Sequence, residues 1–453
     1  MKQESLGLDY GNGRVSRLYF KIFFPTLLGM IFNALLTIID GVFVGQRVGP
    51  DGIAAVNIIA PLFMVTTGIG LMFGIGSSVL AGIALSGKNF ARTNSIVTSG
   101  FLFSTSLIAV LVVAGYAFTT PLVVALGSSA QLDYHTTGYL LYLLPGLIPL
   151  MWQSIGMMVI RLDGSPKYAM MCNVIPAVIN IVLDWWLVFP MDMGVRGAAL
   201  ATSLSCCVGG IMAVAYFRYS YIIRFTRHIR RFGSEVAAQA RIGSSAFVTE
   251  VAMSVMMYTG NYVFMRSFGE SGVAAYSIAC YLFPLIFMIN NAVAQSAQPI
   301  ISYNFGRGSD SRVSEALKVS IFTAIVCGLI AWAVISQGAR FIVAMFISPE
   351  CEAGMIAVAG LPVFALAAIF FGLNITFIGY YQSTGKAVQA LVYTLLRGVI
   401  FLVPLFLILS RIYPSWGMWC AIPASEFLTF LLIITLYSFR KKSHVVSQSA
   451  AGK

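Results

Sequence analysis

VGPDGIAAVNI, at residues 48–58, and FGESGVAAYSI, at residues 268–278, align without a gap at an offset of 220 residues. Each stretch has a polar, glycine-containing start that leads into an apolar run. A second match follows at almost the same offset, since GSPK at 164–167 corresponds to STGK at 383–386. Turns that recur at a fixed distance indicate an internal duplication, so the two halves of the chain should share one fold.

The composition around these stretches predicts an integral membrane protein. Of the 453 residues, 58% are hydrophobic and only 10% are charged, and the mean hydropathy is +0.87. Soluble domains carry about 25% charged residues, so a soluble fold is excluded. A spanning helix needs about 20 mostly apolar residues. We predict twelve such spans, at 18–46, 53–84, 94–120, 136–160, 168–190, 196–219, 240–267, 274–303, 316–347, 354–382, 388–410 and 416–439.

The positive charges predict the orientation of these spans. Most of the 28 Lys and Arg residues fall in segments on the same side as the N-terminus, with the densest run at 218–235. Positively charged loops stay in the cytoplasm, so we expect both termini to be cytoplasmic. The net charge of +12 then reflects orientation and contact with anionic membrane lipids. No nucleic-acid partner is expected.

The duplication and the span count together predict the fold class. Each half has six spans, and an even number gives both halves the same orientation in the membrane. We expect an all-α membrane protein with twelve transmembrane helices in two pseudo-symmetric six-helix bundles. The first bundle should comprise residues 1–225 and the second residues 226–453. Paired bundles around a central cavity are a common plan of transporters.

Several motifs in this framework resemble those of the multidrug and toxic compound extrusion (MATE) transporters. They are Pro25, Asp40, GVRGAALAT at 194–202 and Q-x-x-Q-P at 295–299. The resemblance extends over nearly the whole chain and rests on the order and spacing of the motifs. It implies a V-shaped pair of bundles. It also implies export of varied organic, often cationic, compounds, driven by inward flow of Na⁺ or H⁺.

Four acidic residues interrupt apolar spans: Asp40, Asp184, Glu250 and Glu426. An ionisable side chain at membrane depth destabilises the protein by several kcal/mol unless it is paired or hydrated. Each of the four is therefore a candidate functional residue.

Asp40 and Asp184 could lie at a common depth in the outer half of the membrane. Asn180 precedes Asp184 by one helical turn and shares its face, and Thr202 lies in the next span. Two carboxylates, an amide oxygen and a hydroxyl suit Na⁺, and the carboxylates equally suit a proton. In the family that the chain resembles, the matching residues form the cation-coupling site. The alternative is a buried polar network that only fixes helix packing.

Other polar residues are candidates for a substrate cavity or a second ion site. Asn33 and Thr37 share the helical face of Asp40. Glu250 matches a span-seven acid that, in one branch of the family, acts with a span-ten acid, but the second position here is Asn374. This departure weakens the case for a second Na⁺ site. Glu250 could instead bind a cationic substrate, carry a proton, or be a hydrated acid at the interface.

Span eight carries a polar stripe formed by Asn291, Gln295 and Gln298. Lipid does not accommodate such a stripe, so these side chains should face protein or water. Lining of a cavity and hydrogen bonding between helices remain equal alternatives.

Arg397 and Glu426 are both embedded, at similar distances from the cytoplasmic ends of spans eleven and twelve. We expect them to form a structural ion pair that stabilises the second half.

No constellation of catalytic residues and no phosphate-binding loop occurs in the sequence, which favours a transporter without enzymatic activity or cofactor, driven by an ion gradient. We expect a multi-pass antiporter of the bacterial inner membrane that exchanges organic compounds for H⁺ or Na⁺ and is monomeric. A flippase for lipids or lipid-linked saccharides is the alternative, although few intramembrane cations are present to hold a phosphate headgroup. A channel or receptor is a third interpretation, which the duplication and the paired acids disfavour.

Overall fold

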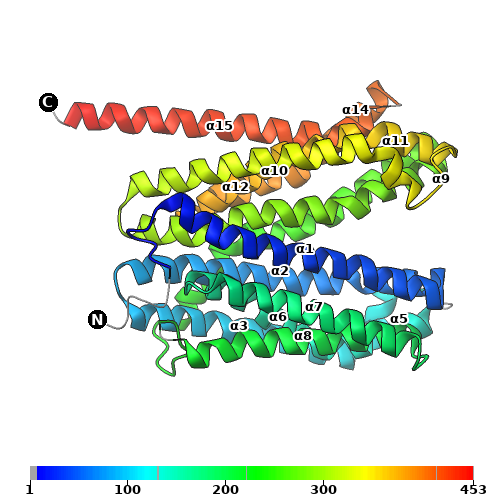
Figure 1. Cartoon of the computed structure of the whole chain (residues 1–453), viewed down its shortest axis with the longest axis horizontal. Helices are drawn as coiled ribbons and strands as arrows, with labels where there is room; N and C mark the ends of the chain where they lie inside the picture. The colour runs from blue at the N-terminus through cyan, green and yellow to red at the C-terminus, as the bar shows by residue number, and fades with distance from the viewer. Residues whose placement is uncertain (1–7, 130–131, 221, 415, 452–453) are drawn as a thin grey trace. The chain divides into compact units, whose positions relative to one another are not determined.

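A computed structural model describes residues 8–129, 132–220, 222–414 and 416–451. Within these ranges the chain is helical, with short connections and no β-strand (Figure 1). The all-α prediction is therefore confirmed.

The first half of the chain contains six membrane-spanning elements, of which the fourth is a kinked combination of three segments. A short helix, α4, connects the third and fourth elements. The helices are α1 Val15–Val48, α2 Pro50–Ser86, α3 Phe90–Ala117, α4 Thr119–Ala125, α5 Asp133–Leu143, η1 Leu144–Gly146, α6 Leu147–Leu162, α7 Pro166–Val188 and α8 Gly194–Tyr219.

The second half begins with a helix of 75 residues, α9, which is far too long for a single crossing. Gly269 interrupts it with non-helical torsion angles, so α9 provides two spans. Eleven helical segments are long and apolar enough to cross a membrane, and the division of α9 gives the twelve predicted. The helices are α9 Phe232–Gly306, α10 Asp310–Ala344, α11 Glu352–Ala365, α12 Ala367–Ser383, α13 Ala387–Leu395, η2 Leu396–Ile400, α14 Leu402–Ile412 and α15 Gly417–Ala451.

The duplication is visible in the backbone as well as in the sequence. Gly49 has φ 82° and ψ −159°, and Gly269, 220 residues later, has φ 61° and ψ −147°. Only glycine adopts this region readily, which explains why the repeated stretch keeps a glycine there. Positive φ recurs at matching positions in two further turns, Lys88 and Gly308, and Gly164 and Gly385.

The chain forms two compact units. Unit 1 comprises Met1–Val251, Gln295–Ala316 and Gln382–Ala387, and unit 2 comprises Ala252–Ala294, Leu317–Tyr381 and Val388–Lys453. These units follow the packing of the helices. The assignment of residues 1–225 and 226–453 to two functional bundles stays a prediction.

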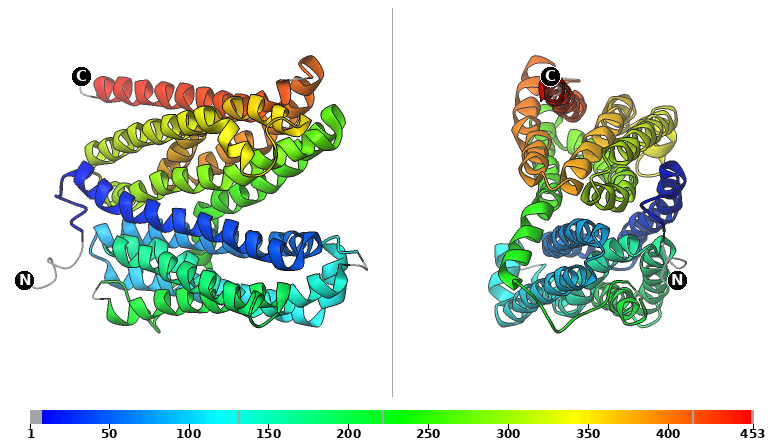
Figure 2. Two further views of the ribbon diagram at one scale, coloured as in Figure 1. Left: turned by 45° about the vertical axis from the view of Figure 1, so that its right-hand side comes forward. Right: turned by 90° about the vertical axis from the view of Figure 1, so that its left-hand side faces the viewer.

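In unit 1, α6 lies among its neighbours and most of its side chains are buried. It packs against α2 and α8, while α7 packs against both α1 and α8. Figure 1 shows these helices running side by side, and the right-hand view of Figure 2 looks along them. Small residues permit the close approach. A Cβ on Gly156 would lie 2.6 Å from the Cβ of Ala213, and one on Gly210 would lie 2.4 Å from the carbonyl oxygen of Pro149. This packing fixes α7 and α8 against α1.

Candidate functional site

Three packed helices of unit 1 carry the predicted coupling residues. Asn180 and Asp184 lie one turn apart on α7, and neither has any exposed surface. Thr202 on α8 is 7% exposed, and Asp40 on α1 is half-buried. Since α7 contacts both α1 and α8, the helix packing brings residues from distant parts of the sequence to one region.

The polar atoms of these residues are mostly without partners. The Nδ2 atom of Asn180 donates a hydrogen bond to the hydroxyl of Thr202 at 3.5 Å. Among the described residues, no donor reaches the Oδ1 atom of Asn180, either carboxylate oxygen of Asp184, or the Oδ1 atom of Asp40. Buried acceptors are nearly always hydrogen-bonded in stable proteins. Four unpartnered oxygens on three neighbouring helical positions therefore indicate a place that receives something from outside the fold.

Asp40 and Asp184 are close enough for their charges to repel each other. Both also act electrostatically on the buried hydroxyl of Tyr139, which comes from α5. The sequence did not point to Tyr139, because it is one of 20 tyrosines and lies in an ordinary apolar stretch. Its proximity makes it a further polar neighbour of the two acids.

This arrangement can take up a cation. A buried carboxylate without donors or counter-charge is strongly destabilising, and two like charges in one place increase the penalty. Either a proton or a small hard cation removes it, and the oxygen ligands present are those that Na⁺ prefers. No group of three or more His, Cys, Asp or Glu side chains suited to a metal occurs in the described ranges. A bound Na⁺ would use the two acids together with the amide and hydroxyl oxygens.

The structure locates the remaining candidates on the same helices. Asn33 is half-buried on α1, whereas the side chain of Thr37 lies outside the described residues. Glu250 is half-buried on α9, and its Cβ lies 3.6 Å from the position of a Cβ built on Gly68 of α2. Their assignment to a substrate cavity stays a prediction.

The polar stripe of span eight makes hydrogen bonds within the protein. Gln295 accepts one from the Nη1 atom of Arg161 on α6 at 2.7 Å. The Nε2 atom of Gln298 donates one to Gln382 of α12 at 3.2 Å. Both glutamines are buried, while the half-buried Asn291 donates to a carbonyl one turn earlier in α9. These bonds match the helix-to-helix alternative for Gln295 and Gln298.

In unit 2, Arg397 and Glu426 meet. The Nε atom of Arg397 lies 3.2 Å from the Oε1 atom of Glu426, and both side chains are 5% exposed. Asn374 donates to the Oε2 atom of Glu426 at 2.7 Å and to its backbone oxygen at 2.8 Å. The guanidinium also lies 4.3 Å from the ring centre of Phe371. The π-helical turn η2 carries Arg397.

A third buried acid, Asp163, lies in the turn between α6 and α7. Its Oδ2 atom accepts hydrogen bonds from Tyr216 and Ser220, each at 2.6 Å, while no donor among the described residues reaches Oδ1. Burial raises the pKa of Asp163 to about 6, and the two hydrogen bonds act in the opposite direction. The sequence gave no reason to select this residue beyond its place in a turn.

Comparison with known proteins places these observations in a family. The MatE family profile matches residues 25–186 and 246–407, so its two matches recur with the internal duplication. The multidrug export protein MepA of Staphylococcus saprophyticus is 25% identical over 422 residues and covers 92% of each chain. MepA of Staphylococcus haemolyticus is 25% identical over 424 residues with the same coverage. A solved outward-facing multidrug resistance MATE family transporter of the MOP superfamily has the same fold, with a TM-score of 0.90, 20% identity, and coverage of 97% of this chain and 98% of that chain.

Proposed function

Since this chain belongs to the MatE family, we propose that it is a secondary active exporter that exchanges organic compounds for an inward-moving cation. The observation that carries this proposal is the completely buried Asp184, whose two carboxylate oxygens have no donor among the described residues. A residue with only a packing role would be expected to have its acceptors satisfied.

We propose that Asp40, Asn180, Asp184 and Thr202 bind the coupling cation, with Tyr139 close by. The cation is either H⁺, carried by a carboxylate, or Na⁺, held by the carboxylate, amide and hydroxyl oxygens. Binding neutralises the repulsion between Asp40 and Asp184. Loaded and empty forms therefore differ in the charge buried between α1, α7 and α8, which gives the cation a differential affinity for two packings of these helices.

Organic, often cationic, compounds are the proposed substrates. The relatives named MepA are multidrug export proteins, which supports this class. Asn33 and Glu250 provide polar and acidic groups on α1 and α9, and a half-buried carboxylate suits a cationic ligand. The bacterial origin of these relatives and the asymmetry of Lys and Arg support a plasma-membrane location with both termini in the cytoplasm.

Reconstitution tests the proposal directly. Proteoliposomes are loaded with a high internal H⁺ or Na⁺ concentration, and accumulation of external ethidium is followed under each gradient alone. We expect accumulation with one gradient and its loss in Asp40→Asn. Asp192→Asn is the matched control, because Asp192 is an exposed acid paired with Arg47. Ethidium flux that is equally fast without any gradient would overturn the proposal, as would wild-type behaviour of Asp40→Asn.

A further inference from the structure

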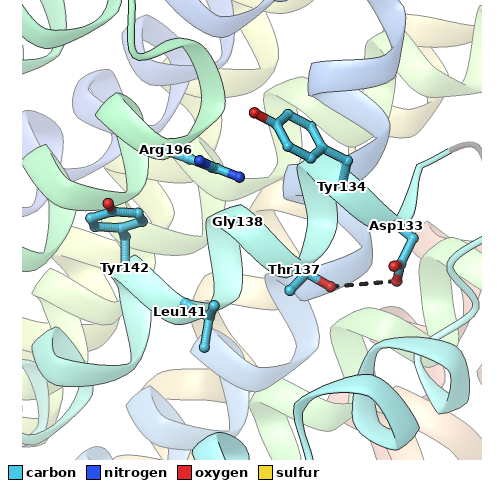
Figure 3. A pocket seen from close by; sticks show the side chains of 7 residues that line it. All are labelled: Asp133, Tyr134, Thr137, Gly138, Leu141, Tyr142 and Arg196. Atoms are coloured by element: carbon cyan, nitrogen blue, oxygen red, sulfur yellow. Dashed lines mark hydrogen bonds between the residues drawn. The ribbon is translucent and has the colours of Figure 1, made fainter.

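A cavity of about 530 Å³ lies in unit 1, away from the coupling residues. The first three turns of α5 line it, together with Arg196 from the first turn of α8 (Figure 3). Asp133 and Tyr134 are at one end, and Leu141 and Tyr142 are at the other. Polar and aromatic side chains therefore share a recess that the proposed transport cycle does not use.

The topology places this cavity on the side of the membrane opposite to the termini. α5 begins after three crossings and α8 begins after five, so both helices start on that side. The cavity extends along α5 from its first residue, Asp133, to Tyr142. Nine residues of helix correspond to about 14 Å, which leads from the headgroup region into the hydrocarbon. The polar end of the cavity thus lies at the depth of lipid headgroups and its apolar end at the depth of acyl chains.

The position of Arg196 depends on a missing side chain. A Cβ on Gly138 would lie 2.8 Å from the Nε atom of Arg196, so glycine makes the room in which the arginine lies against α5. The guanidinium stands 4.5 Å from the ring centre of Tyr134, a favourable cation–π geometry. The Nε atom has no acceptor among the described residues. The charge is oriented by its neighbours but is not neutralised.

The cavity holds one positive and one negative group that do not pair with each other. Ion pairs in the described part of the chain join Arg47 to Asp192, Arg340 to Glu350 and Arg397 to Glu426. Asp133 instead accepts a hydrogen bond from Thr137 at 3.4 Å. Two separated opposite charges at the polar end are complementary to a zwitterion.

We propose that this cavity binds the headgroup of phosphatidylethanolamine from the outer leaflet. The phosphate pairs with Arg196, whose planar fork suits a phosphate, and the ammonium donates to the carboxylate of Asp133. The acyl chains follow Leu141 and Tyr142 into the membrane. A cationic organic substrate fits less well because Arg196 repels it, and an anionic lipid lacks the ammonium that Asp133 requires.

Native mass spectrometry of the detergent-purified full chain, titrated with dioleoyl-phosphatidylethanolamine, tests this site. We expect Arg196→Gln to weaken the binding about tenfold, as the loss of a charge-assisted contact would. Arg340→Gln is the matched control, because Arg340 is an exposed arginine near the end of α10 on the same side of the membrane. Equal affinity of wild type and Arg196→Gln would overturn the proposal.

A second variant separates headgroup recognition from general attraction to lipid. Asp133→Asn should weaken binding of phosphatidylethanolamine several-fold and strengthen binding of dioleoyl-phosphatidylglycerol, because the carboxylate no longer attracts ammonium or repels negative charge. Arg196→Lys keeps the charge and should retain most of the binding, which covers the case in which Arg196→Gln fails to fold. Headgroup-independent binding, or displacement of the lipid by ethidium, would overturn the proposal.

Discussion

The two halves of the chain share a backbone framework but treat their buried acids in opposite ways. In unit 1, Asp184 is completely buried and neither carboxylate oxygen has a donor among the described residues. In unit 2, Glu426 is as deeply buried, yet it has an ion pair with Arg397 and hydrogen bonds from Asn374. A satisfied acid needs nothing more from its surroundings, whereas an unsatisfied acid needs a cation. The difference separates a structural site from one that can bind and release a charge.

The duplication makes this contrast sharper. At the offset of 220 residues, Asp40 corresponds to Gly260 and Asp184 corresponds to Pro404. In the reverse direction, Glu426 corresponds to Cys206 and Arg397 to Ala177. Neither set of charged residues has a counterpart in the other half. The helices and turns are thus common to both halves, while the buried charges arose separately and can serve different purposes.

The largest effect is expected at Asp184. Asp184→Asn should abolish gradient-driven ethidium transport to the level of empty liposomes, because the amide cannot bind and release a proton or neutralise Na⁺. The melting temperature of the variant should stay the same or rise, since an unpaired buried carboxylate destabilises the fold. Transport assays and thermal unfolding of the same preparation test both parts.

Asp192→Asn, an exposed substitution of the same type, should retain transport. If Asp184→Asn lost transport only because it unfolded, its melting temperature would fall, and the contrast between the two acids would disappear.

The next largest effect should appear in the paired site. Arg397→Gln leaves Glu426 buried without a counter-charge, which should reduce the free energy of unfolding by about 3–5 kcal/mol. The double variant Arg397→Met/Glu426→Leu should recover most of this loss, because it removes both charges and keeps the volume. Unfolding by denaturant titration measures both. A single variant as stable as the wild type would show that the ion pair does not hold unit 2 together.

Sequence patterns predicted the spans and the duplication better than the site. Long apolar runs determine where helices cross, and the two glycine-containing stretches mark equivalent turns, so both follow from local chemistry. The junction of spans seven and eight was harder to describe, since Gly269 bends one continuous helix, α9. Tyr139 could not be predicted, because its nearness to Asp40 and Asp184 depends on how α5 packs in three dimensions. Likewise, only the structure shows that Asn374 donates to Glu426.

A smaller effect should test whether the two halves have equivalent backbones. Gly49→Ala and Gly269→Ala each force alanine into torsion angles that favour glycine, which should reduce stability by about 1–3 kcal/mol. No atom lies within 4 Å of a Cβ built at either position, so strain alone would cause the loss. Melting temperatures of the two variants should fall by similar amounts. Gly41→Ala, a helical position with equally open space, serves as control and should be neutral.

The smallest effect should come from Asp163, which is intermediate between the two sites because it has two donors and no cation. Its pKa in the folded protein is raised to about 6, above that of an unfolded aspartate. The folded state therefore binds more protons than the unfolded state between these values, and this contribution to stability falls as pH rises through them. Relative to Asp163→Asn, the wild type should lose about 1 kcal/mol between about pH 5 and pH 7.

Thermal unfolding of wild type and Asp163→Asn at a series of pH values isolates this term, because all other titrating groups are common to both proteins. Asp310→Asn, which changes an acid at the start of α10 for which the same burial does not apply, should give a pH-independent difference in melting temperature. If the difference between wild type and Asp163→Asn were also independent of pH, hydrogen bonds from Tyr216 and Ser220 would be sufficient to solvate a buried carboxylate. The lack of donors at Asp184 would then be the decisive feature of the coupling site, more than its burial.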